Sequence, residues 1–226
     1  LNPRHDRALL NLAISYTNEG YDAAASQILE KWIAAKYPDI AELVPGVPSP
    51  TREQLHDRVR KMFLTAAQRT PSQGMDPDVQ VGLGVLCYRE DDYEKAIDCF
   101  RSALSIRPND ASLWNRLGAT LANASHSEEA IDAYYKALEL RPSFVRARYN
   151  LAVSCINIGC YRESAENILG AISLHYAEDG DVIDFNRSNN LIDTLRRVFF
   201  AMDRRDLLAK LSPGAKLSDF RGDFKF

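Results

Sequence analysis

Asparagines recur along this 226-residue sequence at spacings that would place their side chains on one face of successive helices. The asparagines of this set are Asn11, Asn18, Asn115, Asn123, Asn150 and Asn157. Asparagine is a mediocre helix former, so its recurrence within helical stretches calls for a functional reason. Its amide carries donors and an acceptor without charge. A row of such amides can therefore bond both the N–H and the C=O groups of an extended peptide.

Two arginines, Arg116 and Arg146, fall in the same pattern and add positive charge to it. Hydrogen bonds from an arginine to a carboxylate are charge-assisted and strong. Together with the asparagines, they suit an anionic group such as the terminal carboxylate of a peptide. The alternative is that each is an ordinary solvated residue, which accounts for any single side chain better than for the whole set.

No other set of residues indicates catalysis, a metal or a cofactor. The cysteines (Cys87, Cys99, Cys155 and Cys160) lack the two-residue gap of a zinc or redox motif. Cys87 and Cys155 lie in apolar stretches that are typical of buried thiols. The four histidines are scattered singly, so we expect them at surface or capping positions. Because the usual phosphate-binding, nucleophile and zinc-protease motifs are also missing, we expect no enzyme, no metal site and no cofactor.

Composition excludes two further classes of function. With 28 Lys+Arg against 31 Asp+Glu, the net charge of −3 argues against nucleic acid as a partner. No apolar run approaches the roughly 20 residues that a membrane span needs. The first ten residues, LNPRHDRALL, carry charges where a secretory signal would be apolar. We therefore expect a soluble intracellular protein.

The elements that must position these side chains follow a 34-residue repeat. Residues 77–110 and 111–144 share a leucine at position 7, glycine at 8, alanine at 20 and 27, an aromatic residue at 24 and proline at 32. This is the tetratricopeptide pattern of two antiparallel helices, in which the proline ends the second helix. One repeat cannot bury its own apolar face, so repeats must stack. The sequence predicts an all-α fold, a tetratricopeptide-repeat right-handed superhelix.

Weaker copies of the repeat flank the strong pair and divide the chain into four parts. The expected parts are an N-terminal repeat group at 1–39, a degenerate hinge repeat at 40–76, three tetratricopeptide repeats at 77–178, and a loop with a C-terminal helical cap at 179–226.

The degenerate repeat has three prolines within six residues, Pro45, Pro48 and Pro50. A regular first helix cannot form across them. We expect an irregular bridge over 40–51 and a helix over 52–70. This repeat is either a hinge between two repeat groups or a surface loop.

Residues 191–211 are amphipathic, with apolar residues at helical spacing. We expect one helix that caps the stack, since a terminal repeat must cover its neighbour's apolar edge. A helix that binds a partner is the alternative. The segment before it, 177–190, has the composition of a loop.

Several segments resemble a known family. AISYTNEGY, DPDVQVGLGVLCY, RPNDASLWNRLGATLAN and SEEAIDAYYKALELRPSFVRARYNLAVSCINIG are similar to the C-terminal half of the peroxisomal import receptor for type 1 targeting signals. The proline-rich break between two repeat groups is also similar. The resemblance covers about residues 8–175. In that family the repeat domain binds cargo proteins by a C-terminal tripeptide of Ser-Lys-Leu type.

The resemblance implies roles for the polar side chains named above. Asn18, Asn115 and Asn150 would hold the terminal carboxylate and the peptide backbone. Arg116 would supply positive potential near the carboxylate, and Arg146 would organise the asparagine network.

The resemblance also implies contacts along the rest of the peptide. Asn157 would bond the peptide backbone upstream. Ile14, Thr17 and Ala119 would wall the pocket for the terminal leucine. Glu19 lies where an acid could attract the penultimate lysine.

In that family a long disordered N-terminal half binds the peroxisomal docking machinery, and no such half is present in this sequence. The resemblance therefore implies a domain that binds cargo but does not deliver it alone. It implies contact with the membrane only through partners, and a cytoplasmic location with cycling to the peroxisomal or glycosomal membrane.

Two other functions were weighed against this one. A chaperone adaptor that grips an acidic C-terminal peptide would need lysine and asparagine where this sequence has Val81 and Val85. A purely structural scaffold would leave the asparagine pattern without a function.

Overall fold

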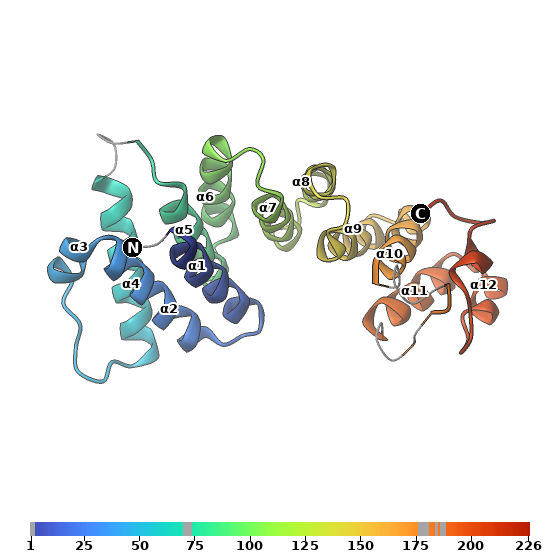
Figure 1. Cartoon of the computed structure of the whole chain (residues 1–226), viewed down its shortest axis with the longest axis horizontal. Helices are drawn as coiled ribbons and strands as arrows, with labels where there is room; N and C mark the ends of the chain where they lie inside the picture. The colour runs from blue at the N-terminus through green and yellow to red at the C-terminus, as the bar shows by residue number, and fades with distance from the viewer. Residues whose placement is uncertain (1–2, 70–73, 176–180, 184, 186–188) are drawn as a thin grey trace. The chain divides into compact units, whose positions relative to one another are not determined.

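The protein folds into two compact groups of helices, which we call unit 1 and unit 2. Unit 1 is Leu1–Pro108 and unit 2 is Asn109–Phe226. The computed structural model describes residues 3–69, 74–175, 181–183, 185 and 189–226 (Figure 1). Within these residues, no helix combines the length and the apolar character that crossing a bilayer requires.

Unit 1 contains six helices among the described residues, and they pack as hairpins. They are α1 (Pro3–Asn18), α2 (Asp22–Lys36), α3 (Pro38–Leu43), α4 (Arg52–Arg69), α5 (Pro77–Arg89) and α6 (Tyr93–Ile106). The hairpins are α1 with α2 and α5 with α6, and both α1 and α4 pack against α5. Because α4 also packs against α2, the degenerate repeat contributes its second helix to the stack.

The glycines of the strong repeats make room for aromatic rings, as the repeat pattern predicts. A Cβ atom on Gly84 of α5 would come within 2.5 Å of the Phe100 ring of α6. In unit 2, a Cβ on Gly118 would come within 2.7 Å of the Tyr134 ring. These contacts are too short for any side chain larger than glycine, so the helices of each hairpin can approach closely only with these residue pairs.

The degenerate repeat is more regular than the sequence analysis expected. Within the predicted bridge 40–51, the first residues belong to α3, whose first residue is Pro38. Proline is compatible with the first helical position, where its missing N–H needs no partner. The irregular part is thus confined to residues 44–51. The helix predicted at 52–70 is confirmed as α4, and Thr51 and Gln54 cap its start through reciprocal side-chain bonds.

Phe63 of α4 holds the degenerate repeat in place. Its ring stacks on Trp32 of α2 with the centroids 5.5 Å apart. On the other side, a Cβ on Gly82 of α5 would come within 2.1 Å of the same ring. Phe63 and Trp32 are both almost fully buried. The predicted hinge repeat therefore packs inside unit 1, and its role as a hinge stays a prediction.

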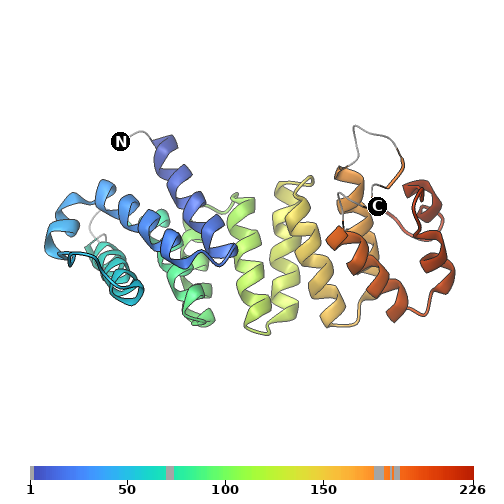
Figure 2. The same ribbon diagram turned by 90° about the horizontal axis from the view of Figure 1, so that it is seen from below.

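Unit 2 continues the hairpin pattern. Its helices are α7 (Ala111–Asn123), α8 (Ser127–Leu140), α9 (Val145–Asn157), α10 (Tyr161–His175), α11 (Asn189–Ala201), α12 (Arg205–Lys210) and a 3₁₀ helix at Leu217–Phe220. Seen from below, the helices from α7 (green) to α11 (orange-red) stand side by side (Figure 2). Each packs on the next, α7 on α8, α8 on α9, α9 on α10 and α10 on α11.

The C-terminal helix predicted at 191–211 is broken in two, so the prediction of one helix was wrong. Helix α11 ends at Ala201, and α12 begins at Arg205. Asp203 between them has a φ of 52°, in the left-handed region that a continuing helix cannot use. The break folds α12 back, and apolar side chains of both helices are buried in one core with α10. Most of the predicted loop at 177–190 lies outside the described residues.

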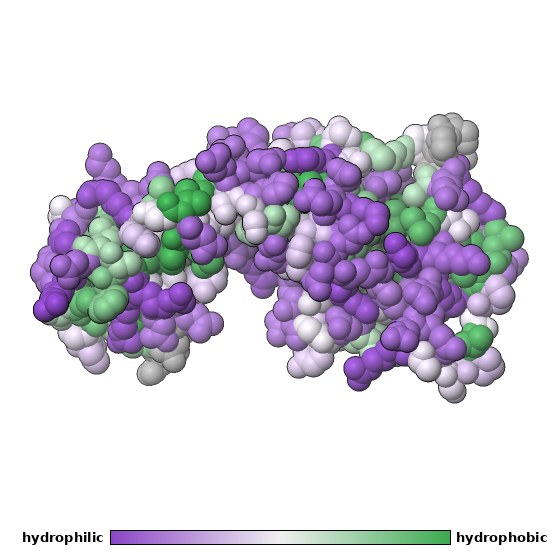
Figure 3. Space-filling model, turned by 180° about the vertical axis from the view of Figure 1, so that it is seen from behind, coloured by the Kyte–Doolittle hydropathy of each residue, from purple (hydrophilic) through white to green (hydrophobic). Residues whose placement is uncertain are grey.

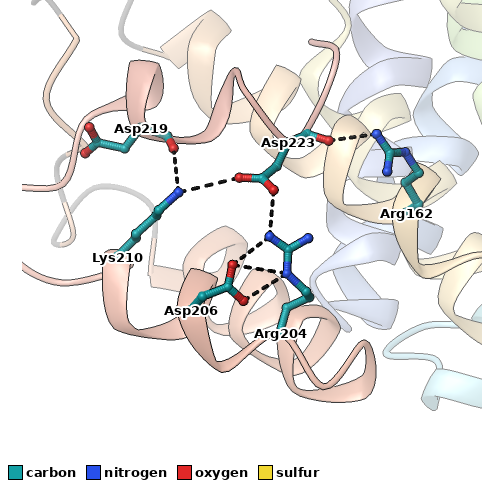
Figure 4. Close-up of polar contacts among 6 residues, drawn as sticks. All are labelled: Arg162, Arg204, Asp206, Lys210, Asp219 and Asp223. Carbon is teal, nitrogen blue, oxygen red and sulfur yellow. Dashed lines mark hydrogen bonds and ion pairs between the residues drawn. The ribbon is translucent and has the colours of Figure 1, made fainter.

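Ion pairs, which Figure 4 shows, and stacked rings hold the end of the chain on this core. Arg204 bonds both Asp206, at 2.7 Å, and Asp223, at 2.6 Å. Arg162 of α10 donates to the backbone carbonyl of Asp223 at 2.7 Å. Phe199 of α11 stacks on Phe220 and Phe224. The C-terminal segment thus covers the apolar edge of the repeats, and the all-α tetratricopeptide-type fold is confirmed.

Candidate functional site

Two asparagines of neighbouring first helices meet in unit 2. Asn115 lies on α7 and Asn150 on α9, and the Asn150 Nδ2 donates to the Asn115 Oδ1 at 3.1 Å. Asn115 is 8% exposed, and Asn150 is half-buried. The sequence predicted both asparagines on one face of successive helices, but it did not predict that Asn115 is buried. Because its Oδ1 is taken, Asn115 keeps its Nδ2 donors for another acceptor.

Arg116 and Arg146 flank this amide pair. Arg116 follows Asn115 on α7, and Arg146 lies one turn before Asn150 on α9. Among the described residues, neither guanidinium has an acid within ion-pair distance. The pKa of Arg116 is lowered to about 10, mainly by burial; the charge of Asp110 opposes the shift, and the charge of Arg146 adds to it. Arg116 therefore stays charged at neutral pH. Its charge has lost water without gaining an ion-pair partner, and a bound anion would supply that partner.

Asp110 is a residue of this region that the sequence analysis missed. Its carboxylate accepts from the backbone N–H of Ser112 at 3.0 Å and of Leu113 at 3.1 Å, so it caps α7. It is also the acid whose charge favours the protonated form of Arg116. The cue was available, since an aspartate directly before a helix is a common N-cap.

The remaining predicted residues of unit 2 lie on the same two helices. Ala119 is half-buried on α7, one turn after Asn115. Asn157 is the last residue of α9 and is exposed. Spacings of four and seven residues separate Arg146, Asn150 and Asn157, so the three share one face of α9.

The predicted residues of unit 1 gather at the end of α1. Asn18 is the last residue of this helix, and Glu19 follows it; both are exposed. Thr17 is half-buried, and its hydroxyl donates to the Ala13 carbonyl at 3.0 Å. Ile14 is 4% exposed, so it belongs to the core of unit 1 and not to an open surface. The roles implied for these residues toward a peptide stay predictions.

A polar cavity of about 430 Å³ lies in unit 1 between the first turns of α2 and α4 and the end of α5. Arg89 crosses it, donating to the Ser26 Oγ at 2.6 Å and to the Asp22 carbonyl at 3.2 Å. His56 also lines it, and its Nε2 lies 2.5 Å from a Glu90 oxygen. His56 is 9% exposed, so the expectation of a surface or capping histidine was wrong. These bonds connect α2, α4 and α5. They give Arg89 and His56 a structural role that requires no ligand.

Exposed apolar side chains of the described residues are spread over several helices. The side drawn in Figure 3 is largely hydrophilic, with separate hydrophobic patches. Phe200 of α11, at 79% exposed, is the most exposed large apolar side chain of the described residues. The described residues also contain no cluster of acids, histidines and cysteines that could hold a metal ion.

Comparison with known proteins gives the same fold and a set of close relatives. A family model for the tetratricopeptide repeat matches residues 76–143. A protein of Candida albicans named "Peroxisomal targeting signal receptor" is 56% identical over 234 residues, which is 100% of this chain and 40% of the relative. Proteins of the same name from Yarrowia lipolytica and Saccharomyces cerevisiae are 57% and 46% identical, with 39% of each relative covered. The chain thus spans about two fifths of the length of these relatives.

Solved structures support the fold. "MamA 41-end from Desulfovibrio magneticus RS-1" matches with a TM-score of 0.53 and 16% identity, over 77% of this chain and 97% of that one. A second structure, "Crystal structure of MamA", matches with a TM-score of 0.52 and 17% identity, over 74% and 95% of the two chains. At these identities, the likeness concerns the helical-repeat fold alone.

Proposed function

We propose that this chain binds the C-terminal targeting peptide of cargo proteins, of Ser-Lys-Leu type. The proposal is supported by its 56% and 57% identity, over its whole length, to two proteins named peroxisomal targeting signal receptor, and by its tetratricopeptide repeats at 76–143. The observation that carries the proposal is the pair of arginines without an acid partner, Arg116 and Arg146, beside the Asn115–Asn150 bond. Two cations and an amide with free donors form a receptor for one anionic group. A free C-terminal carboxylate supplies that group.

The proposed roles follow from the positions of the side chains. Asn115 is held by Asn150 with its Nδ2 donors free, so it donates to a carboxylate oxygen. Arg116, partly buried on the same helix, supplies the balancing charge. Arg146 adds charge at the open side, and Asn157 bonds the peptide backbone upstream. The terminal leucine packs against Ala119.

For unit 1 we propose the contacts that the family resemblance implies. Asn18 bonds the peptide backbone, and Glu19 attracts a penultimate lysine; both are exposed at the end of α1. Thr17 and Ile14 form part of the wall of the pocket for the terminal leucine, and the Ile14 side chain is itself buried. Because Thr17 already bonds the Ala13 carbonyl, its contribution to the peptide is through its methyl group.

The structure gives little support to the chaperone-adaptor alternative. It needs polar side chains at Val81 and Val85, and both valines are buried, at 6% and 4% exposed. The names of the relatives also favour targeting peptides over acidic chaperone tails. We further propose that docking proteins are met through parts of the longer receptor, that the membrane is reached only through them, and that the protein cycles between cytoplasm and peroxisome or glycosome.

Fluorescence anisotropy tests the proposal with two labelled peptides ending in Ser-Lys-Leu, one with a free carboxylate and one amidated. We expect the free acid to bind with micromolar or tighter affinity and the amide to bind far more weakly. Replacing Asn115 by Ala should cost about 1–3 kcal/mol of binding free energy, because a charged group loses a donor. Asn167→Ala, on the second helix α10, is the matched control and should bind as the wild type does. Equal binding of both peptides would refute the carboxylate site.

A further inference from the structure

The irregular segment 44–51 of unit 1 is open to solvent, and the proposed peptide site uses none of its residues. It is the light-blue coil that runs from α3 to α4 in Figure 1. All of its residues except Val44 are exposed. Among the described residues, the backbone groups of 45–50 bond no other group. The middle of the segment can therefore be taken up by an external partner.

Both ends of the segment are anchored on α4. At the first end, the Arg58 Nε donates to the Val44 carbonyl at 2.9 Å. At the other end, Thr51 and Gln54 exchange hydrogen bonds of 3.0 and 3.2 Å. Ser49 lies between these anchors on an exposed loop, the kind of position at which folded chains are accessible to modifying enzymes.

Ser49 also has a backbone conformation that is unfavourable for a serine. Its φ is 52°, in the left-handed region, where the Cβ atom crowds the backbone. Pro50 follows it, and a residue before proline prefers an extended conformation. Drawing this segment into an extended conformation in the cleft of an enzyme therefore relieves strain at Ser49.

The sequence around Ser49 matches the one that proline-directed protein kinases select. Ser49 is followed directly by Pro50 and, at the third position, by Arg52. Proline has no N–H, so it suits a kinase cleft that offers no acceptor at that position. A basic side chain at the third position can pair with an anionic group of the kinase. Arg52 is exposed and forms no ion pair among the described residues.

Two other hydroxyl side chains precede a proline and provide internal comparisons. They are Thr70 and Ser212. Neither has a basic residue at the third position, which is Gln73 after Thr70 and Ala215 after Ser212. Ser212 is exposed, as Ser49 is. Exposure and a following proline are thus shared by Ser49 and Ser212, and the basic residue distinguishes them.

The start of α4 can accept the charge of a phosphate. The backbone N–H groups of Arg52 and Glu53 bond no group among the described residues. A helix N-terminus carries partial positive charge and favours a phosphate beside it. The guanidinium of Arg52 adds a full positive charge at the same place.

We propose that Ser49 is a phosphorylation site for a proline-directed protein kinase. The Ser49 Oγ attacks the γ-phosphorus of ATP, the bond from that phosphorus to the bridging oxygen breaks, and ADP leaves. The hydroxyl proton passes to the aspartate of the kinase catalytic loop. The sum is one serine and ATP to one phosphoserine, ADP and a proton. The product carries up to about two negative charges directly before α4.

Phosphorylation of the whole chain by a purified cyclin-dependent kinase with its cyclin and radioactive ATP tests the proposal. Tryptic digestion and mass spectrometry then locate the phosphate. We expect the peptide 37–52 to gain one phosphoryl group, with fragment ions placing it on Ser49 and not on Thr51. The peptide 211–216, which carries Ser212, should stay unmodified. An unmodified peptide 37–52, or equal labelling of both peptides, would overturn the proposal.

Variants test what selects Ser49. Ser49→Ala should abolish the label in the peptide 37–52. Pro50→Ala should slow labelling at least about tenfold, and Arg52→Ala should slow it to a smaller extent. Pro213→Ala, which replaces the proline beside Ser212, is the matched control and should leave the rate unchanged. Circular dichroism checks that each variant keeps the wild-type helix content. Labelling of Pro50→Ala at the wild-type rate would contradict the assigned kinase class.

A synthetic peptide of residues 43–54 separates the effect of sequence from that of accessibility. It presents the same residues without the fold. We expect the kinase to label the whole chain at a rate within about tenfold of the peptide, because the segment is exposed in the folded protein. A labelled peptide with an unlabelled chain would show that Ser49 is not accessible in the fold, and the proposal would fail.

Discussion

The two units treat their cations differently. In unit 1, cations near helix ends bond acids of neighbouring helices: Arg107 bonds Asp78 at 2.6 Å, and Lys36 bonds Asp76 at 2.7 Å. In unit 2, Arg116 and Arg146 lie on neighbouring helices and have no acid in ion-pair contact among the described residues. Cations at these positions therefore join helices in unit 1, whereas Arg116 and Arg146 of unit 2 remain available, although other cations of unit 2, such as Arg204, do bond acids.

This difference helps to distinguish cations that hold the helices of a repeat protein together from cations that are available to bind a ligand. A partly buried cation without a partner costs free energy, because it loses water without gaining a counter-ion. A fold retains such a group when a ligand supplies the missing charge. Arg89, which bonds Ser26 at 2.6 Å in unit 1, then serves as the structural counterpart to Arg116.

The largest effect is expected where unit 1 depends on apolar packing. Phe63→Ala should lower the free energy of unfolding by about 3–5 kcal/mol, because it leaves a cavity between Trp32 and Gly82. Denaturation with urea, followed by tryptophan fluorescence, measures this change. Phe200→Ala, at a position 79% exposed, is the control and should leave stability nearly unchanged. A loss below about 1 kcal/mol for Phe63→Ala would show that the degenerate repeat is not held by this ring.

Smaller effects are expected when Arg89 or Arg116 is replaced by alanine. The first replacement should affect stability, and the second should affect peptide binding. Arg89→Ala should lower the free energy of unfolding by about 1–3 kcal/mol. The Ser26 hydroxyl loses its hydrogen-bond donor, and the bond that joins α5 to α2 is lost. Arg89→Ala should leave free-acid peptide binding unchanged. Arg116→Ala should weaken binding at least tenfold and leave stability equal or higher, because a desolvated charge is removed.

Thermal unfolding and anisotropy on the same samples give both quantities for each variant. Arg197→Ala, an exposed arginine of α11, controls for loss of charge in unit 2. The comparison of the two units fails if Arg116→Ala destabilises the fold as Arg89→Ala does.

Much of the fold could be predicted because its signals are local. The pairing of Gly84 with Phe100, and the proline two residues after Ile106, recur in the sequence at fixed positions. Such residues act within one hairpin, so their spacing alone defines it. The break at Asp203 could not be predicted, because neither glycine nor proline marks it and the apolar spacing runs through it.

The positions of the candidate residues along their helices could be predicted, but their contacts could not. The spacing placed Asn115 and Asn150 on matching faces, yet their mutual bond and the burial of Asn115 depend on the packing of α7 and α9. The burial of His56 likewise depends on Glu90, 34 residues along the chain. Contacts between helices that are distant in the sequence produce no periodic pattern of residue types from which they could be predicted.

The smallest effect is expected at the exposed ion pairs of the C-terminal segment. The Arg204 side chain holds the pKa of Asp206 at about 2, below the value near 3.9 of an unfolded chain. A depressed pKa stabilises the fold fully above the unfolded value, and this contribution is lost as pH falls from about 4 through about 2. Asp206→Asn should therefore flatten the acid side of the stability curve slightly. Thermal midpoints between pH 5 and 2 test this; an unchanged slope would mean that the pair is fully screened.

We propose that Arg116 lacks an ion-pair partner within the protein so that it can bind the carboxylate of the peptide. The most direct test is a double cycle of anisotropy measurements, with the wild type and Arg116→Ala each titrated against the free-acid and the amidated peptide. We expect amidation to weaken binding strongly in the wild type and much less in Arg116→Ala, a coupling of about 1–3 kcal/mol. If amidation costs the same in both proteins, Arg116 does not recognise the carboxylate.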